Sequence, residues 1–268
     1  MANVGAATAD GTGINLGTAD VDGLRSALRG ELIGSDHAGY ETARRVWNGN
    51  VDRRPALIVR ATGAADVQQA VNFARINRLA LALRGGGHSA PGYGTNDGGL
   101  VLDLSAMKGI RVDPGARTVR AEGGVLWREL DHETQAFGLA TTGGTVSNTG
   151  IAGLTLGGGV GYLVRKYGLT IDNLLACEVV TANGELVTAS ADANPDLFWG
   201  LRGGGGNFGV VTSFEYRLHP LSTVLGGLVL YPLAQARDVL RSIYASFTEG
   251  LDTRDLQDAG ALLESRAG

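Results

Sequence analysis

Three dense clusters of glycine constrain this chain more than any other feature of its sequence. Glycine supplies 43 of the 268 residues, more than twice the usual share of about 7%. The clusters fall within residues 84–99, 143–161 and 200–209, without a fixed period, so a collagen-like repeat is excluded. Because glycine has no Cβ, it lets a backbone take positive φ and approach a ligand closely. The clusters therefore predict special backbone geometry within a folded protein.

The clusters have two interpretations, a ligand site and a set of tight turns. Consecutive N–H groups in glycine-rich loops form concavities that bind anions. The first cluster follows a predicted strand, which is where parallel α/β units place their ligand loops. One cluster alone favours turns, but three clusters, one of them carrying Arg84-Gly85-Gly86-Gly87-His88-Ser89, favour a diphosphate-bearing ligand held by several loops.

Composition excludes several classes of function. Hydrophobic residues make up 44% and charged residues 19%, which is enough for a sizeable core. The formal net charge of −4 argues against a nucleic-acid partner. A single cysteine, Cys177, excludes an internal disulfide, and four scattered histidines make a metal site improbable. No basic start, secretory signal or membrane-spanning run is visible, so we expect a cytoplasmic protein without a membrane partner.

The first part of the chain shows the strand–helix–strand pattern of a small parallel sheet. The predicted elements are strands over Ala56–Arg60, Leu79–Arg84 and Gly99–Leu104, with a helix over Gly63–Ile76. Residues 1–35 are small and polar, and we interpret them as an N-terminal arm outside the core. A modest helix is expected within that arm, from about Asp22 to Leu32.

The second part of the chain is predicted to form a mainly antiparallel sheet with helices, which makes the fold class α+β. The expected strands are Thr118–Ala121, Leu174–Thr181, Glu185–Ala189 and Phe208–Leu218, and the expected helices are Val125–Phe137 and one through Tyr162–Tyr167. The Asn183-Gly184 pair is typical of a hairpin. Alternation along the last strand predicts one face with Val210, Phe214, Tyr216 and Leu218, and another with Val211, Ser213, Glu215 and Arg217.

Residues 221–268 are predicted to begin a third unit. A strand is expected over Leu225–Tyr231 and an amphipathic helix over Leu233–Phe247, whereas the last twenty residues are polar and without pattern. Because one strand and one helix cannot close a sheet, we expect a truncated unit with an exposed apolar helix face.

The common nucleotide and hydrolase fingerprints are absent. No Gly-Lys pair exists for a Walker A loop, and no G-x-G-x-x-G opens a helix after the first strand. The run from Gly87 to Pro91 nearly matches the G-x-S-x-G elbow of serine hydrolases, but Pro91 replaces the last glycine.

Five motifs, in order over about residues 40–232, resemble the berberine-bridge-enzyme-like FAD-linked oxidases of the vanillyl-alcohol-oxidase superfamily. They are RGGGHS from Arg84, GGTV from Gly143, GLTLGGGVG from Gly153, GLTIDN from Gly168 and FWGLRGGGGNFGVV from Phe198. The resemblance implies a PCMH-type FAD-binding domain over residues 36–220. It also implies subdomains of about 36–114 and 115–220 with the dinucleotide between them, and the start of a substrate domain over 221–268.

The resemblance also implies which residues bind FAD. The first glycine loop would wrap the pyrophosphate, and His88 would carry the flavin through a bond from its imidazole to the 8α-methyl carbon. Neutral imidazole is a nucleophile near neutral pH, although His88 as a hydrogen-bonding turn residue is the alternative. Arg84 would neutralise a phosphate or pair with a carboxylate. The expected cofactor-binding residues are Arg84, Gly85, Gly86, Gly87, His88, Ser89, Gly92, Thr142, Gly144, Thr145, Gly150, Gly153, Leu154, Gly158, Gly161 and Val211.

Two positions depart from the pattern of the family. Val146 stands where some members carry a cysteine that forms a second flavin link, and Cys177 lies in a predicted strand as a buried apolar residue. We therefore expect one covalent link. Leu154 stands where several members place a histidine at the pyrimidine edge of the flavin, so backbone amides must stabilise the reduced anion here.

The resemblance implies hydride transfer from an alcohol, sugar or amine C–H to flavin N5, followed by reoxidation by oxygen. The expected partners are a small-molecule substrate, molecular oxygen and a partner chain that would supply the missing domain. The catalytic base is expected in that domain, so no catalytic residue is assigned. An inactive or partner-dependent FAD-binding fragment is the alternative function. A non-covalent FAD reductase of the same superfamily is a third hypothesis, disfavoured by His88 and by the motif of the third cluster.

The remaining aromatic and histidine side chains have plainer interpretations. Tyr93, Tyr162 and Tyr167 have two interpretations, facing a flavin or substrate and serving as helix-packing or loop aromatics, of which the second is favoured. Trp199 is expected in the core. His132 and His219 are expected to be structural.

Overall fold

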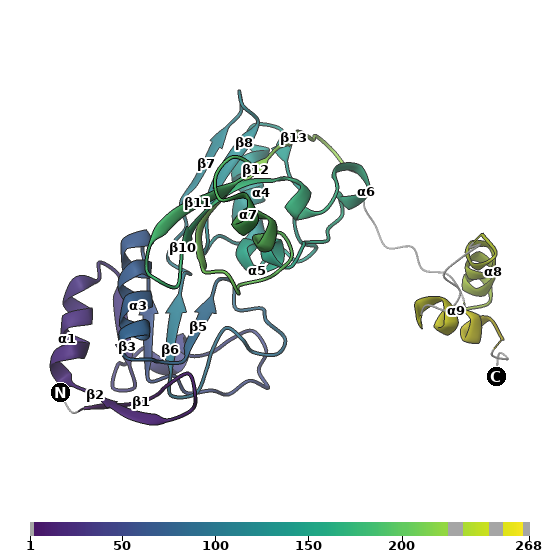
Figure 1. Cartoon of the computed structure of the whole chain (residues 1–268). Helices are drawn as coiled ribbons and strands as arrows, with labels where there is room; N and C mark the ends of the chain where they lie inside the picture. Colours follow the sequence, from purple (N-terminus) through teal and green to yellow (C-terminus); the bar gives the residue numbers. More distant parts are fainter. Residues whose placement is uncertain (1–2, 225–232, 247–253, 265–268) are drawn as a thin grey trace. The chain divides into compact units, whose positions relative to one another are not determined.

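The computed structural model describes residues 3–224, 233–246 and 254–264. The chain divides into two units, Met1–Ser222 and Thr223–Gly268 (Figure 1). The first unit contains two lobes, each built around one sheet.

The first lobe is a four-stranded sheet in the order β3-β4-β6-β5. Strands β4 (Leu57–Arg60), β6 (Leu100–Asp103) and β5 (Leu81–Arg84) are parallel, whereas β3 (Glu31–Gly34) pairs antiparallel with β4 at the edge. All four residues of β6 are buried, as expected for a parallel strand covered on both faces. Helix α3 (Ala64–Ile76) presents Val67, Ala70, Val71 and Ala74 to the core. The strand–helix–strand prediction is confirmed.

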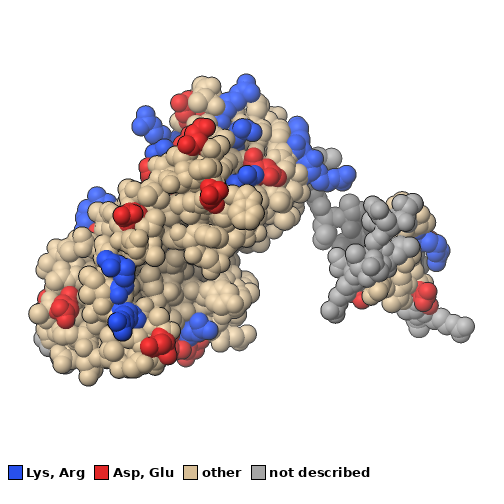
Figure 2. All heavy atoms as spheres, in the orientation of Figure 1, with Lys and Arg blue, Asp and Glu red and all other residues tan. Residues whose placement is uncertain are grey.

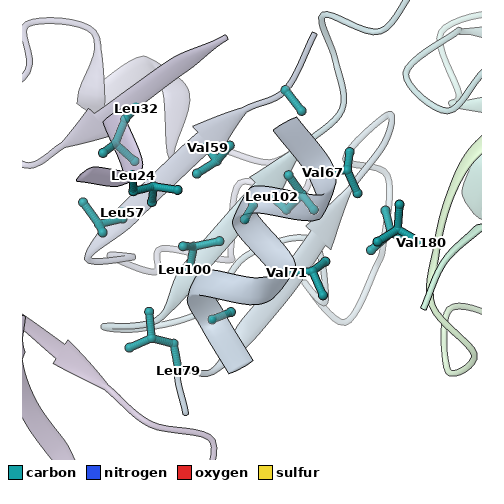
Figure 3. Close-up of a cluster of buried hydrophobic side chains, with 14 of the residues drawn as sticks. Leu24, Leu32, Leu57, Val59, Val67, Val71, Leu79, Leu100, Leu102 and Val180 are labelled. Carbon is teal, nitrogen blue, oxygen red and sulfur yellow. The ribbon is translucent and has the colours of Figure 1, made fainter. Parts of the chain in front are cut away.

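The N-terminal segment belongs to this lobe rather than forming a separate arm. Its elements are β1 (Val4–Ala7), β2 (Gly13–Leu16), α1 (Thr18–Ala27) and β3. Leu16, Val21, Leu24 and Leu32 are buried in the core that also holds α3, as Figure 3 shows for Leu24 and Leu32. The expectation of a segment outside the core is therefore wrong for the described residues, because a few well-spaced apolar side chains suffice to bury it. The domain boundaries themselves stay a prediction.

The helix expected over Asp22–Leu32 has different limits. Helix α1 ends at Ala27, and Leu32 lies in β3. The sequence pattern could not separate the two elements because Leu24 and Leu32 face the same core.

The second lobe is a five-stranded antiparallel sheet in the order β11-β10-β12-β8-β7. Its strands are β7 (Ile110–Asp113), β8 (Thr118–Glu122), β10 (Leu174–Val180), β11 (Leu186–Ser190) and β12 (Val210–Arg217). The antiparallel arrangement and the hairpin at Gly184, whose φ is 82°, agree with the sequence prediction. The α+β fold class is confirmed.

Short helices and a two-stranded pair complete this unit. They are α2 (Tyr40–Ala43), α4 (Trp127–Gln135), α5 (Ile151–Leu156), α6 (Val164–Tyr167), the 3-10 helix η1 (Thr170–Asp172), α7 (Pro195–Leu201), and the strands β9 (Leu139–Ala140) and β13 (His219–Pro220). The helix expected from Tyr162 begins only at Val164.

The strict alternation expected along β12 is wrong at its start. The register against β10 shifts, because Val179 pairs with Val211 while Glu178 pairs with Ser213. Thr212 is therefore the extra residue of a bulge, which reverses the side of every residue before it. As a result Val211 packs with Phe214 in the core of the second lobe, whereas Val210 packs in that of the first.

The two lobes share buried contacts. Val180 of β10 and Val210 of β12 join the cluster of the first lobe, and Figure 3 shows Val180 beside Val67 and Val71 of α3. The second lobe has its own cluster around Trp127, Phe214 and Tyr216.

The second unit contains α8 (Leu233–Tyr244) and α9 (Arg254–Glu264). Helix α8 agrees with the predicted helix, and the strand expected at Leu225–Tyr231 lies outside the described residues. The expectation of a patternless end is wrong over α9. A Cβ at Gly260 of α9 would lie 3.1 Å from the Tyr244 hydroxyl, so the absence of a side chain lets the two helices approach. None of the described helices is long and apolar enough to cross a membrane.

Candidate functional site

Two glycine-rich loops meet where the lobes join. The first loop, residues 85–99, follows β5, and the second loop, residues 141–161, follows β9 and contains α5. Figure 1 shows the carboxyl ends of β5 and β6 directed toward the second lobe. Ligands of parallel sheets bind beyond the carboxyl ends of their strands.

The backbones of the two loops touch, which explains glycine at the contact points. A Cβ at Gly86 would lie 2.3 Å from the Gly150 nitrogen, and one at Gly150 would lie 2.5 Å from the Gly86 nitrogen. Within the second loop, a Cβ at Gly161 would lie 1.6 Å from the Gly143 oxygen. No side chain fits at these distances, so clusters that are far apart in sequence form one site.

A row of backbone donors lines the first loop. Among the hydrogen bonds of the described residues, none is donated by the N–H groups of Gly85 to Ser89. Consecutive free N–H groups next to a positive-φ glycine, here Gly87 at 71°, form an anion-binding concavity.

The charges around the two loops suit an anion. Within residues 85–99 and 141–161 the acidic and basic side chains are His88 and Asp97, and the Asp97 carboxylate accepts a hydrogen bond from the Arg54 N–H at 2.8 Å. Figure 2 shows acidic and basic side chains scattered over one face of the first unit, without a continuous stripe of either sign. Binding of an anion here would depend on backbone dipoles.

Arg84 takes the second of its two expected roles and pairs with a carboxylate. Its Nη2 lies 3.0 Å from the Asp103 carboxylate and donates to the Ala43 carbonyl at 2.7 Å, and its Nη1 donates to the Arg45 carbonyl. The residue is buried, and the charge of Arg84 helps to hold the pKa of Asp103 below its usual range although burial raises it. Arg84 therefore anchors the start of the first loop from inside the protein.

His88 lies half-buried on the first loop with its imidazole against the indole of Trp47. The ring centroids are 5.2 Å apart and the planes meet at 20°. The Trp47 N–H donates to the Gly87 carbonyl at 3.1 Å, and the Asn48 side chain donates to the Ala90 carbonyl at 2.8 Å. Sequence reasoning missed Trp47 and Asn48. The signal for Trp47 was a tryptophan within a polar segment, and Asn48 had none.

The rest of the first loop is fixed by local bonds. The Ser89 hydroxyl accepts from the Tyr93 N–H at 3.1 Å, and the Ser89 carbonyl accepts from the Gly92 N–H. Gly92 has a φ of 80°, and a Cβ there would lie 2.7 Å from Val51. Tyr93 is an exposed aromatic residue of this loop, in agreement with one of its expected positions.

The second loop contains buried threonines and an exposed tip. The Thr142 hydroxyl donates to the Gly168 carbonyl at 2.9 Å, while the Thr142 carbonyl accepts from the Thr170 hydroxyl. Thr142 therefore fixes the loop, whereas Thr145 and Val146 are exposed. The Thr141 hydroxyl is buried without a hydrogen-bond partner among the described residues, and sequence reasoning missed it.

Leu154 packs between the two arms of the second loop. A Cβ at Gly144 would lie 2.6 Å from its Cδ1, and one at Gly159 would lie 2.8 Å from its Cδ2. Gly153, next to it, is exposed with nothing within 4 Å of its Cβ position, and Gly158 has a φ of 107°.

The third cluster serves turn geometry in this structure. Gly200 and Gly204 leave room for the Phe208 ring, and Gly209 has a φ of 136°. Val211, expected at the cofactor, is buried in the core of the second lobe. Trp199 is 79% exposed, so its expected core position is wrong.

Other candidate residues have structural surroundings. Burial raises the pKa of the Cys177 thiol to about 12, which confirms a buried apolar cysteine. His219 lies 2.6 Å from the Asn173 side chain and stacks on Tyr167. Burial, followed by Arg217 and Lys166, lowers the pKa of His219. No group of three metal-ligating side chains occurs in the described part of the chain.

Comparison with known proteins connects this geometry to one cofactor. The family model described as an FAD binding domain matches residues 55–190. An (R)-6-hydroxynicotine oxidase of Paenarthrobacter nicotinovorans is 40% identical over 240 residues, covering 84% of this chain and 52% of that protein. An FAD-linked oxidoreductase of Dictyostelium discoideum is 42% identical over 208 residues, covering 77% of this chain and 46% of the other. The chain thus spans about half the length of these relatives.

Solved structures give the same result. The crystal structure of 6-hydroxy-D-nicotine oxidase from Arthrobacter nicotinovorans matches with a TM-score of 0.77 and 35% identity, over 90% of this chain and 60% of that one. A glucooligosaccharide oxidase of Acremonium strictum, with a 6-S-cysteinyl, 8α-N1-histidyl FAD, matches with a TM-score of 0.69 and 33% identity. That match covers 74% of this chain and 42% of the oxidase.

Proposed function

Because this chain belongs to the FAD-binding domain family, we propose that its two glycine loops hold FAD for an oxidoreductase. The observation that carries the proposal is the row of free N–H groups from Gly85 to Ser89, set against the second loop at Gly150. A diphosphate is the part of FAD that such a row would bind.

The residues around the row fit the cofactor. The close backbone contact of Gly86 with Gly150 leaves no room for a side chain between the loops, and that of Gly161 with Gly143 leaves none within the second loop. The Thr141 hydroxyl of the second loop is buried and has no partner among the described residues, and such groups usually have a partner in the complete complex. Gly153 and Thr145 are exposed on the same loop.

His88 is proposed to carry the flavin covalently. The bond would join an imidazole nitrogen to the 8α carbon. The bond would replace the imidazole N–H hydrogen and one hydrogen of the methyl group, and the two protons and two electrons released would pass to the flavin and finally to oxygen, giving hydrogen peroxide. The histidyl FAD of the Acremonium oxidase supports a link of this kind in the family.

A single link is proposed rather than two. The only cysteine, Cys177, is buried in β10 with a raised pKa, so its thiol is neither ionised nor accessible. Val146 on the second loop has no nucleophile to offer.

The chain's own residues would orient the cofactor, which supplies the redox chemistry by accepting hydride at N5. Leu154 brings an apolar side chain and no donor, so stabilisation of a reduced flavin would depend on backbone N–H groups. An alcohol, sugar or amine donor, oxygen as acceptor, a partner chain supplying the substrate half and a cytoplasmic location remain part of the proposal.

The test is to produce the chain, denature it in acid and measure flavin absorbance in the protein pellet. We expect the yellow colour to stay with the protein, and to pass into the supernatant for His88→Ala. A wild-type chain that releases all its flavin would overturn the covalent link, and a colourless chain that also fails to bind added FAD would overturn the proposed function.

A further inference from the structure

We infer that Trp47 is a positioning residue for His88 and speeds the covalent attachment of FAD, an inference that rests on the proposed function. The indole and imidazole rings are stacked at 5.2 Å with nearly parallel planes. Stacking of this kind restricts rotation of both rings. It covers a face of the imidazole and leaves the ring edge, where both nitrogens lie, uncovered by Trp47.

Trp47 is held in place by a segment that we call the strap, residues 43–54. The strap runs alongside Arg84 and the first loop in the same direction, and hydrogen bonds join it to them at successive points. These are Arg84 to the Ala43 carbonyl at 2.7 Å, Trp47 N–H to the Gly87 carbonyl at 3.1 Å, Asn48 to the Ala90 carbonyl at 2.8 Å, and Arg53 to the Gly92 and Thr95 carbonyls at 3.2 and 3.0 Å.

The strap is also closed on itself. The buried guanidinium of Arg44 pairs with the Asp52 carboxylate and with Glu41. Bonds on both sides of His88, at Gly87 and Ala90, therefore fix the backbone of Trp47 relative to the imidazole.

The exposure of Trp47 indicates that its side chain contributes to the site rather than to the hydrophobic core. Its side chain is 64% exposed, whereas Trp127 is fully buried at the centre of the second lobe. Among the described residues, the aromatic ring that Trp47 contacts is that of His88. Its removal should therefore cost little stability while freeing the imidazole.

The expected effect follows from orientation. A nucleophile reacts faster when its rotation is already restricted to the productive geometry. Loss of one aromatic stack should slow attachment about tenfold. A phenylalanine retains a ring for stacking, so Trp47→Phe should stay near the wild-type rate.

The experiment uses the full chain produced under riboflavin limitation, with FAD added at time zero. Acid-stable flavin is followed by in-gel fluorescence for wild type, Trp47→Ala, Trp47→Phe and the matched control Trp199→Ala, which also removes an exposed indole. FAD affinity is measured separately in the His88→Ala background with and without Trp47→Ala. We expect slow attachment in Trp47→Ala alone, with an unchanged affinity.

Three outcomes would overturn the inference. Attachment of Trp47→Ala at the wild-type rate would do so. A loss of FAD affinity as large as the loss of rate would show that Trp47 binds the cofactor instead. If the NMR chemical shifts of the His88 ring protons are the same in wild type and Trp47→Ala, the two rings are not stacked in solution. This readout does not depend on whether flavin attaches. By contrast, a wild type without acid-stable flavin would refute the covalent role of His88 and not the stack.

Discussion

The carboxylate of Asp66 joins three parts of the first lobe at one point. It accepts hydrogen bonds from the N–H groups of Arg29, Gly30 and Thr62 at 2.8, 3.1 and 2.8 Å, and from the Thr62 hydroxyl at 2.9 Å. Burial raises the pKa of this carboxyl, but the hydrogen bonds outweigh burial and hold the pKa below its ordinary value of 3.8. The start of α3 is thereby tied to the turn between α1 and β3.

Asp66 should therefore give the fold an acid-sensitive contribution. Because the folded pKa is lower than the unfolded pKa, the stabilisation is complete above the unfolded value and is lost as the pH falls through the folded value. Asp66→Asn should lower the free energy of unfolding by about 2 kcal/mol at neutral pH. In acid, the difference in this free energy between the variant and wild type should become smaller. Urea unfolding across pH measures this, with the exposed Asp192→Asn as control. An equal difference at all pH values would refute the argument.

A side chain at Gly86 should separate the two loops. Its Cβ would lie 2.3 Å from the Gly150 nitrogen and 2.6 Å from the Gly150 Cα. Both are backbone atoms, so they cannot move aside as the end of a flexible side chain could. Gly86→Ala should cost about 1–3 kcal/mol of stability and weaken FAD binding at least tenfold. Gly206→Ala is the control, since nothing lies within 4 Å of its Cβ position. Thermal unfolding and FAD titration report the two effects, and a fully stable Gly86→Ala that binds FAD normally would contradict the contact.

At the scale of elements, α1 shows how little apolar sequence suffices to attach a helix. Only Val21 and Leu24 of its ten residues are buried, yet both enter the cluster that holds α3. The strand that follows, β3, then completes the edge of the parallel sheet through its pairing with β4.

Helix α1 should therefore contribute to global stability. Leu24→Ala removes a side chain that is 5% exposed and should cost about 3 kcal/mol, whereas Ile76→Ala, at 72% exposed, should change stability by less than about 0.5 kcal/mol. Denaturant unfolding of the two variants tests this. Equal stabilities would mean that the N-terminal segment does not belong to the folding unit.

At the scale of the whole molecule, the two lobes of the first unit are joined through one buried cluster. Val180 and Val210 come from the sheet of the second lobe and pack with the parallel sheet and α3 of the first. A site formed by loops from both lobes needs this coupling, because Gly86 and Gly150 must stay in contact.

The lobes should consequently unfold together. Val180→Ala should lower the free energy of unfolding by about 2 kcal/mol, as expected for a buried truncation with some cavity. Hydrogen exchange should show the same loss of protection in β6 of the first lobe and β12 of the second. Loss confined to one of these strands would show that the lobes unfold separately.

The glycine clusters by themselves determined much of the candidate site. The clusters predicted loops that hold a diphosphate-bearing ligand, because glycine reports a backbone requirement that is local. The family resemblance of their motifs implied FAD and the role of the loop with His88, and the hydrophobic patterns predicted the α+β fold. The βαβ unit and the hairpin at Gly184 were equally local, since period and turn chemistry specify them.

What the tertiary structure decided depends on contacts between distant residues. The Arg84 guanidinium can bind phosphate or carboxylate, and the positions of Asp103, Ala43 and Arg45 around it select the carboxylate. The stack of Trp47 on His88 joins residues far apart in the chain, and a bulge at Thr212 reversed the predicted faces of the residues before it, Val210 and Val211. Sequence alone determined which segments bend and which alternate, because those are properties of neighbours. Only the folded chain determined which polar groups remain free for a ligand, because the hydrogen-bond partner of a polar group can come from any part of the folded structure.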